Sequence, residues 1–352
     1  MSSIDIRRFV NINILPHISQ NVNSTRDTTV LFSNEIANES FDKTFNSLEE
    51  VKKDNDIKNL VNTVKYAEMY FNNNGNKLRI IKSTLDSLKN NINKLEDKYI
   101  VIAFTEGTYS NLVNIAKQLE SNYGVKQKII LSRTNSTTIF EKLNNLVVKY
   151  SNEIGAEMTV AAYLSNIDVY GINTVQDYAF TKENITQEEQ DDDLLESILQ
   201  TANVDMMLAG TVRNLGGNLT NEYSLVNQFC LIVLHQTVTE RVLNLLTQKI
   251  KGNDGLTALH SVISQELGKY VTSGYLSTDK IWKDKDLTIT YNNQSYTIIK
   301  QGTSLSLGYK IAILPLTSLT DEDIANKKTP PIYIILSESY GIRMVEISGE
   351  VI

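Results

Sequence analysis

The sequence predicts a multidomain protein that combines α/β and α+β regions, with an extended β-strand arm at each end. The chain has 352 residues, more than one ordinary hydrophobic core accommodates, so two or three domains are expected. Strands and helices alternate between residues 99 and 164, a pattern typical of an α/β layer. Near both ends apolar and polar residues alternate, as in a strand with two different faces.

Each end of the chain predicts an arm strand, within residues 1–20 and within residues 340–352. The apolar positions that would form one face of each arm are Val10, Ile12 and Ile14 at the start, and Val345, Ile347 and Val351 at the end. Pro16 is expected to stop the first run. A strand at a chain end leaves backbone groups that another sheet edge must satisfy, so we expect both arms to pair with neighbouring molecules. Two such ends on one chain predict a polymer.

The segment 21–98 is expected to begin with an apolar strand at 29–32. Ser47 and Glu50 have the spacing of a capping box, which marks a helix start. Apolar residues recur at helical spacing over 57–71, and a strand follows at 78–81.

The segment 99–210 predicts an α/β domain. Its expected elements are a strand at 99–105, a helix at 109–123, a strand at 128–133, a helix at 137–150 and a strand at 158–164. Continuous apolar runs such as 100–104 suit strands that helices cover on both faces. An acidic stretch at 186–193 is then expected to open a helix, and residues 206–209 to form a strand.

The segment 211–339 predicts an α+β domain. After a glycine-containing loop we expect two long helices, 224–251 and 256–272, separated by Gly252 and Gly255. Asn292 and Asn293 mark a β-hairpin, and another strand is expected at 305–314. A short helix at 320–328 carries acidic residues first and lysines last, as a helix dipole favours. Two prolines end it before the C-terminal strands.

Charge and hydropathy exclude two kinds of partner. The net charge is −7 and the isoelectric point is about 5.2, whereas a nucleic-acid-binding surface needs a basic patch. No segment approaches the apolar length of a membrane helix, and the start of the chain lacks the layout of a signal peptide, so synthesis in the cytosol is expected.

Catalytic and metal-binding residues are scarce. The three histidines, His17, His235 and His260, stand in separate contexts, and Cys230 lies in an apolar run. The acidic run 191–193 lacks the alternating donors of an ion loop and is expected to be a solvated helix start. We therefore expect no catalytic residue, no metal and no cofactor.

Gly107 supports a weaker alternative hypothesis, that the chain is an α/β enzyme or small-ligand binder. It follows the expected strand 99–105 and precedes a helix, which is where α/β enzymes bind phosphate groups. A single glycine without companions more often marks a plain turn.

The order of elements resembles that of the contractile tail sheath family of myophages and R-type bacteriocins. The residues that carry the resemblance are Tyr66, Ala67, Tyr70, Phe71, Leu78 and Ile80 in the first third, Asn214, Gly216, Gly217 and Tyr223 in the centre, and Gly268, Val271, Gly274, Tyr275, Gly308, Tyr309 and the segment 321–331 toward the end. The two terminal strands complete the pattern. The chain is short for this family, which implies few outer domains.

The resemblance implies a structural subunit without enzymatic activity. Such subunits form a helical homo-polymer of hexameric rings around an inner tail tube protein, between baseplate and tail terminator proteins, and contract by lattice rearrangement. It also implies an α/β outer region, a C-terminal α+β core domain, synthesis in the bacterial cytoplasm, and assembly in a phage tail or bacteriocin particle.

The short helix at 320–328 is the segment we expect to face the tube. Its charged residues, Asp321, Glu322, Asp323, Lys327 and Lys328, would form exposed ion pairs of about 0 to 1 kcal/mol each. Two other hypotheses remain open: another tail or virion assembly protein such as a tube or connector protein, and an α/β enzyme or small-ligand binder that uses the turn at Gly107.

Overall fold

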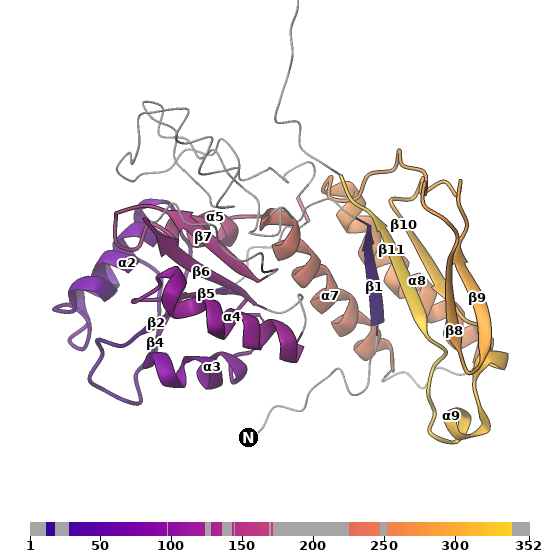
Figure 1. Cartoon of the computed structure of the whole chain (residues 1–352), viewed down its shortest axis with the longest axis horizontal. Helices are drawn as coiled ribbons and strands as arrows, with labels where there is room; N and C mark the ends of the chain where they lie inside the picture. Colours follow the sequence, from indigo (N-terminus) through magenta and orange to yellow (C-terminus); the bar gives the residue numbers. More distant parts are fainter. Residues whose placement is uncertain are drawn as a thin grey trace, which may run out of the picture. The chain divides into compact units, whose positions relative to one another are not determined.

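A computed structural model gives the fold, and it describes residues 12–17, 28–96, 98–123, 128–135, 143, 145–168, 170–171, 225–246 and 252–339. The chain forms two compact units. One contains Ser24–Asp168 and is called here the α/β unit; the other contains Val233–Ser339 with the N-terminal strand and is called the α+β unit (Figure 1). The α/β unit holds a six-stranded sheet, and the α+β unit holds a three-stranded sheet and a two-stranded hairpin.

The six-stranded sheet has the order β3-β4-β2-β5-β6-β7. Its strands are β2 (Thr29–Ser33), β3 (Asp42–Phe45), β4 (Leu78–Lys82), β5 (Val101–Phe104), β6 (Ile129–Thr134) and β7 (Leu146–Tyr150). All neighbouring pairs are parallel except β3 with β4. Every residue of β2 and β5 is buried, as expected for central strands that are covered on both faces.

Five described helices belong to this unit: α1 (Leu48–Lys53), α2 (Val61–Asn72), α3 (Leu85–Asn93), α4 (Tyr109–Tyr123) and α5 (Met158–Ser165). Apolar residues of α3 and α4 pack on one face of the sheet, where Leu88, Leu112 and Ala116 meet Phe104 and Ile130 in one core (Figure 1). Helix α5 lies against β5 and β6, and α2 packs on α5.

Several predicted elements of this unit are confirmed, and two are wrong. The strands at β2, β4, β5 and β6 and the helix α4 match, whereas residues 158–164 form α5 and not a strand. All residues of α5 except Tyr163 are buried, so the run is apolar on every side and has no periodicity that could separate helix from strand. The predicted helix 137–150 is also wrong at its end, because residues 146–150 form β7; residues 136–142 lie outside the described part.

The remaining differences concern boundaries. The limit we placed between residues 98 and 99 falls inside the six-stranded sheet, since β2 pairs with both β4 and β5. Strand β3 and helix α3 were not predicted from the sequence. The elements expected at 186–193 and 206–209, and the loop before α7, lie outside the described residues.

The α+β unit is built on two long helices, α7 (Leu225–Leu246) and α8 (Gly252–Thr272), with α7 shared between the units because the division follows Ile232. Gly252, expected to separate the helices, is the first residue of α8 with φ of 56°, and Gly255 is buried inside that helix.

The strands of this unit form a hairpin and a small mixed sheet. The hairpin joins β8 (Leu287–Tyr291) and β9 (Gln294–Ile299) through Asn292 and Asn293, whose φ angles of 46° and 61° confirm the predicted turn. The sheet has the order β1-β11-β10, with β1 (Ile12–His17), β10 (Tyr309–Ile313) and β11 (Ile332–Ser337). A 3-10 turn at Leu316–Ser318 and α9 (Asp321–Ala325) connect β10 to β11.

Helix α7 corrects one expectation about hydropathy. By length and composition it could cross a membrane, so the expectation that no segment reaches this apolarity is wrong. However, 61% of its apolar window is buried inside the protein, as is typical of a core helix. Its Thr237 hydroxyl lies 2.7 Å from the Tyr270 hydroxyl of α8.

Candidate interaction surfaces

Helix α9 forms because Thr320 and Asp323 cap it. The Thr320 hydroxyl accepts a hydrogen bond of 3.1 Å from the backbone N–H of Asp323, and a carboxylate oxygen of Asp323 accepts one of 3.2 Å from the Thr320 N–H. This reciprocal pair satisfies two donors that a helix start leaves free. The helix is short because Lys327 adopts a left-handed φ of 54°, which ends the helical path.

The charges predicted to face the tube do not all point outward. Asp321, Glu322, Lys327 and Lys328 are exposed, but Asp323 is 7% exposed and its carboxylate lies 2.7 Å from Lys328 Nζ. The hydrogen bonds from Lys328 and Thr320 hold the pKa of Asp323 well below its usual range. The expectation of an exposed ion pair at Asp323 is therefore wrong, because this residue fixes the shape of α9.

Ile324 is an exposed apolar residue of α9 that was not among the predicted site residues. Its side chain is 58% exposed and lies beside the exposed acids Asp321 and Glu322. A single exposed apolar side chain is normal on a protein surface, so Ile324 by itself does not identify a contact.

The small sheet places part of the predicted N-terminal arm. Ile12 and Ile14 lie in β1, which pairs in parallel with β11 of the same chain, opposite Ile332 and Ile334. Pro16 does not stop the strand, since β1 extends to His17; an edge strand tolerates proline because one side of its backbone needs no partner. The other arm residues, Val10, Val345, Ile347 and Val351, lie outside the described residues. Within the described chain β10 pairs with β11 alone, so its outer edge is open.

The carboxyl edge of the six-stranded sheet is the other place where chemistry could occur. The sheet's strand order changes direction between β2 and β5, and ligands of α/β proteins bind at such points. Here the Glu35 carboxylate accepts hydrogen bonds from the backbone N–H groups of Asn62 at 3.2 Å and Thr63 at 2.7 Å. The N-terminus of α2 is thus occupied by the protein's own anion.

A second carboxylate occupies the turn at Gly107. A Cβ atom at Gly107 would lie 2.8 Å from Glu157 Oε1, and the Tyr66 hydroxyl donates to the same oxygen at 2.7 Å. Burial raises the pKa of the Glu157 carboxyl from 4.5 to about 7, although the hydrogen bond from Tyr66 and the charge of Arg133 lower it. Burial and the nearby Glu157 raise the pKa of Tyr66 well above its ordinary value. A phosphate at this turn would meet a carboxylate instead of open N–H groups.

The described residues contain no cluster of potential metal ligands at this edge or elsewhere. Across the parts of the chain with described coordinates, no group of three or more His, Cys, Asp or Glu residues could hold a metal ion. His260 is exposed and Cys230 is buried within α7.

Comparisons with solved structures identify the class of fold. No protein-family model matches the sequence, and no curated protein matches it. The chain nevertheless has the fold of contractile tail sheath proteins, which confirms the predicted resemblance in the architecture.

The particular matches come from the anti-feeding prophage. A chain of its helical sheath in the contracted state has a TM-score of 0.63 and 11% identity, covering 97% of this chain and 97% of that one. A chain of its six-fold symmetrised baseplate has a TM-score of 0.63 and 11% sequence identity, and the match covers 95% of this chain and 98% of that one. A chain of its baseplate in the contracted state has a TM-score of 0.62 and 13% sequence identity, and the match covers 97% of this chain and 98% of that one. Coverage this complete means that the fold is shared along nearly the whole chain.

Proposed function

We propose that this chain is the structural subunit of a contractile tail sheath. It polymerises in rings around an inner tube and contracts by rearrangement of the lattice, which drives the tube through a target envelope. The single observation that carries this proposal is the fold likeness over 97% of both chains to the helical sheath of the anti-feeding prophage. In this role the subunits would form hexameric rings, and their partners would be the inner tube, baseplate and tail terminator proteins.

The role requires no catalysis. The two positions at the sheet edge where an α/β enzyme would bind phosphate hold Glu35 and Glu157. The Glu35 carboxylate would repel an anionic ligand, and the Glu157 side chain lies close against the turn at Gly107, which disfavours the small-ligand hypothesis. The energy for contraction would come from the surface that subunits bury when the lattice rearranges.

The arms connect subunits in this proposal. The edges of the sheet β1-β11-β10 are the surfaces that donated strands would extend. Deletion of residues 340–352 should leave a folded monomer that cannot form sheaths, and retained polymerisation would contradict the assignment of this arm.

Helix α9 faces the tube in this proposal, through Asp321, Glu322, Ile324 and Lys327. The cleanest test is Lys327→Glu, because Lys327 is exposed whereas Lys328 is paired with Asp323. We expect Lys327→Glu to reduce the fraction of tubes that carry extended sheath, with Lys327→Arg as the matched control. Normal extended sheaths on tubes in the Lys327→Glu particles would refute this contact.

Electron microscopy of the expressed chain tests the function as a whole. The proposal predicts hollow helical cylinders that are wide enough to enclose a tube. Narrow tubes of the chain alone would instead support the hypothesis of a tube protein, and isolated rings a connector.

A further inference from the structure

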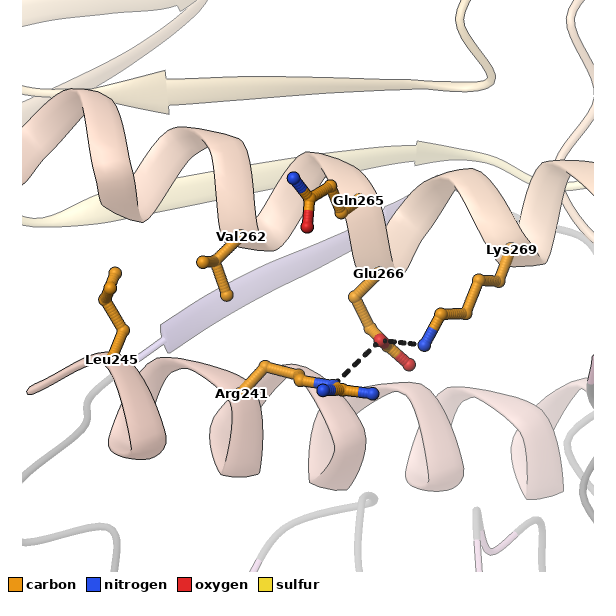
Figure 2. Close-up of a pocket in the computed structure, with 6 residues that line it drawn as sticks. All are labelled: Arg241, Leu245, Val262, Gln265, Glu266 and Lys269. Atoms are coloured by element: carbon orange, nitrogen blue, oxygen red, sulfur yellow. Dashed lines mark hydrogen bonds and ion pairs between the residues drawn. The ribbon is translucent and has the colours of Figure 1, made fainter. Parts of the chain in front are cut away.

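The described surface of the α+β unit contains a hollow between α7 and α8 that carries excess positive charge. It has a volume of about 270 Å³ and is lined by Arg241 and Leu245 of α7 and by Val262, Gln265, Glu266 and Lys269 of α8 (Figure 2). Arg241 and Lys269 point toward Glu266 from opposite helices. Two cations thus share one carboxylate.

The buried carboxylate is already satisfied without Arg241. Glu266 is 2% exposed, and its Oε2 lies 2.6 Å from Lys269 Nζ. Its Oε1 accepts a hydrogen bond of 3.0 Å from the Tyr170 hydroxyl. Lys269 is also held over the ring of Tyr170, 4.8 Å from its centroid. Lys269, Glu266 and Tyr170 therefore form a complete group.

Arg241 contacts this group of residues through one nitrogen of its guanidinium. Its Nε lies 3.4 Å from Glu266 Oε2, and its side chain is 57% exposed. Within the described residues this ion pair is its only polar contact, so the terminal nitrogens of the guanidinium can still donate. A guanidinium prefers two parallel hydrogen bonds to a carboxylate, and arginine is enriched in the contacts between proteins.

We propose that the hollow binds an acidic side chain of a second copy of this chain. The guanidinium of Arg241 donates two parallel hydrogen bonds to the incoming carboxylate, and the side-chain amide of Gln265 lies on the α8 side of the hollow. Leu245 and Val262 contact the methylene groups of the incoming residue. Charge complementarity favours this partner, because the chain carries 41 acidic against 34 basic residues and copies of it need local positive sites to associate. The inference rests on the proposed polymeric function and assigns one contact within it.

Charge changes at Gln265 test the contact without disturbing the buried group. Gln265 is exposed, and its described bond is a long one of 3.4 Å to Ser261 Oγ. Gln265→Glu should raise the critical concentration for polymerisation about threefold to fivefold, as for the loss of one exposed ion pair. Gln265→Lys should leave it unchanged or lower it. Thr257, which is exposed on the same helix and bonds only its own helix backbone within the described chain, provides matched controls, Thr257→Glu and Thr257→Lys.

The outcomes separate this inference from the proposed function. If the wild type polymerises, equal critical concentrations for Gln265→Glu and Gln265→Lys would show that the hollow is not a contact. The same conclusion would follow if Thr257→Glu and Thr257→Lys differed in critical concentration by as much as the two Gln265 variants do. A wild-type chain that never polymerises would overturn both proposals. Unchanged unfolding midpoints of the four variants would show that the effect lies in assembly. Arg241→Lys should also weaken assembly, because lysine keeps the positive charge but cannot donate two parallel hydrogen bonds to one carboxylate.

Discussion

The buried carboxyl of Glu157 should make the α/β unit less stable as the pH rises. Its pKa is raised from 4.5 to about 7 in the folded chain, so the folded state binds a proton that the unfolded state releases. This penalty is absent below pH 4.5, grows between pH 4.5 and 7, and is constant above. The full difference corresponds to at most about 3.4 kcal/mol of unfolding free energy.

Glu157→Gln removes the titration and keeps an oxygen that accepts from Tyr66. The variant also leaves Arg133, 4.0 Å from the carboxylate, without its nearby counter-charge, which reduces the gain. We therefore expect the variant to exceed the wild type in unfolding free energy by about 1 to 3 kcal/mol at pH 8 and by much less at pH 4.5.

Two optical probes distinguish the units in this experiment. The only tryptophan, Trp282, lies in the α+β unit, so its fluorescence reports that unit, whereas far-ultraviolet circular dichroism reports both. Urea unfolding of wild type and variant at several pH values should show the pH-dependent difference in circular dichroism. A difference that is the same at pH 4.5 and pH 8 would refute the assignment of a raised pKa to Glu157.

Three further changes lie in the α+β unit and can be followed by Trp282 fluorescence during urea unfolding. Thr320→Ala removes the cap of α9 and should cost about 1 kcal/mol, whereas Thr320→Ser should cost little; equal losses would refute the cap. Gly308→Ala should cost about 1 to 3 kcal/mol, since Gly308 has a φ of 79° and a Cβ would lie 2.9 Å from Val271; an unchanged midpoint would contradict the strain. Asn292→Ala should cost about 1 to 2 kcal/mol, because it forces alanine into a left-handed turn and removes the hydrogen bonds to the Ser318 carbonyl at 2.8 Å and to the Asp323 carboxylate at 3.3 Å; Asn292→Gly, which removes the hydrogen bonds without the backbone strain, should cost less.

The parts of the fold that the sequence predicted are those with a local signal. The α4 helix has a clear apolar period, β5 is a continuous apolar run beside a turn, and the Asn292-Asn293 hairpin depends on two residues that tolerate positive φ. Helix α5 and strand β7 were confused because both are buried on all sides. In such runs only the neighbours in space decide between helix and strand.

The candidate surfaces divide in the same way. The Thr320 and Asp323 pair has the spacing of a capping box, the same signal that identified the N-cap Ser47 of α1, and it could have shown that Asp323 is internal. No such signal links Tyr66 to Glu157, which are 91 residues apart. Such a pair is visible only once the sheet brings the ends of its strands together.

The pairing of β1 with β11 limits how strand donation can stabilise a polymer. In the single chain β1 already satisfies the edge of β11, so an arm from a neighbour at that position would replace β1 instead of adding to it. Each backbone hydrogen bond of about 0.5 to 1.5 kcal/mol would then be exchanged for an equivalent one, as in domain swapping. The open edge of β10 has no such competitor among the described strands. Under the proposed function, the net free energy of assembly must therefore come from the outer edges of β1 and β10 and from side-chain contacts such as the hollow at Arg241, while exchange at β11 keeps subunits connected at little cost.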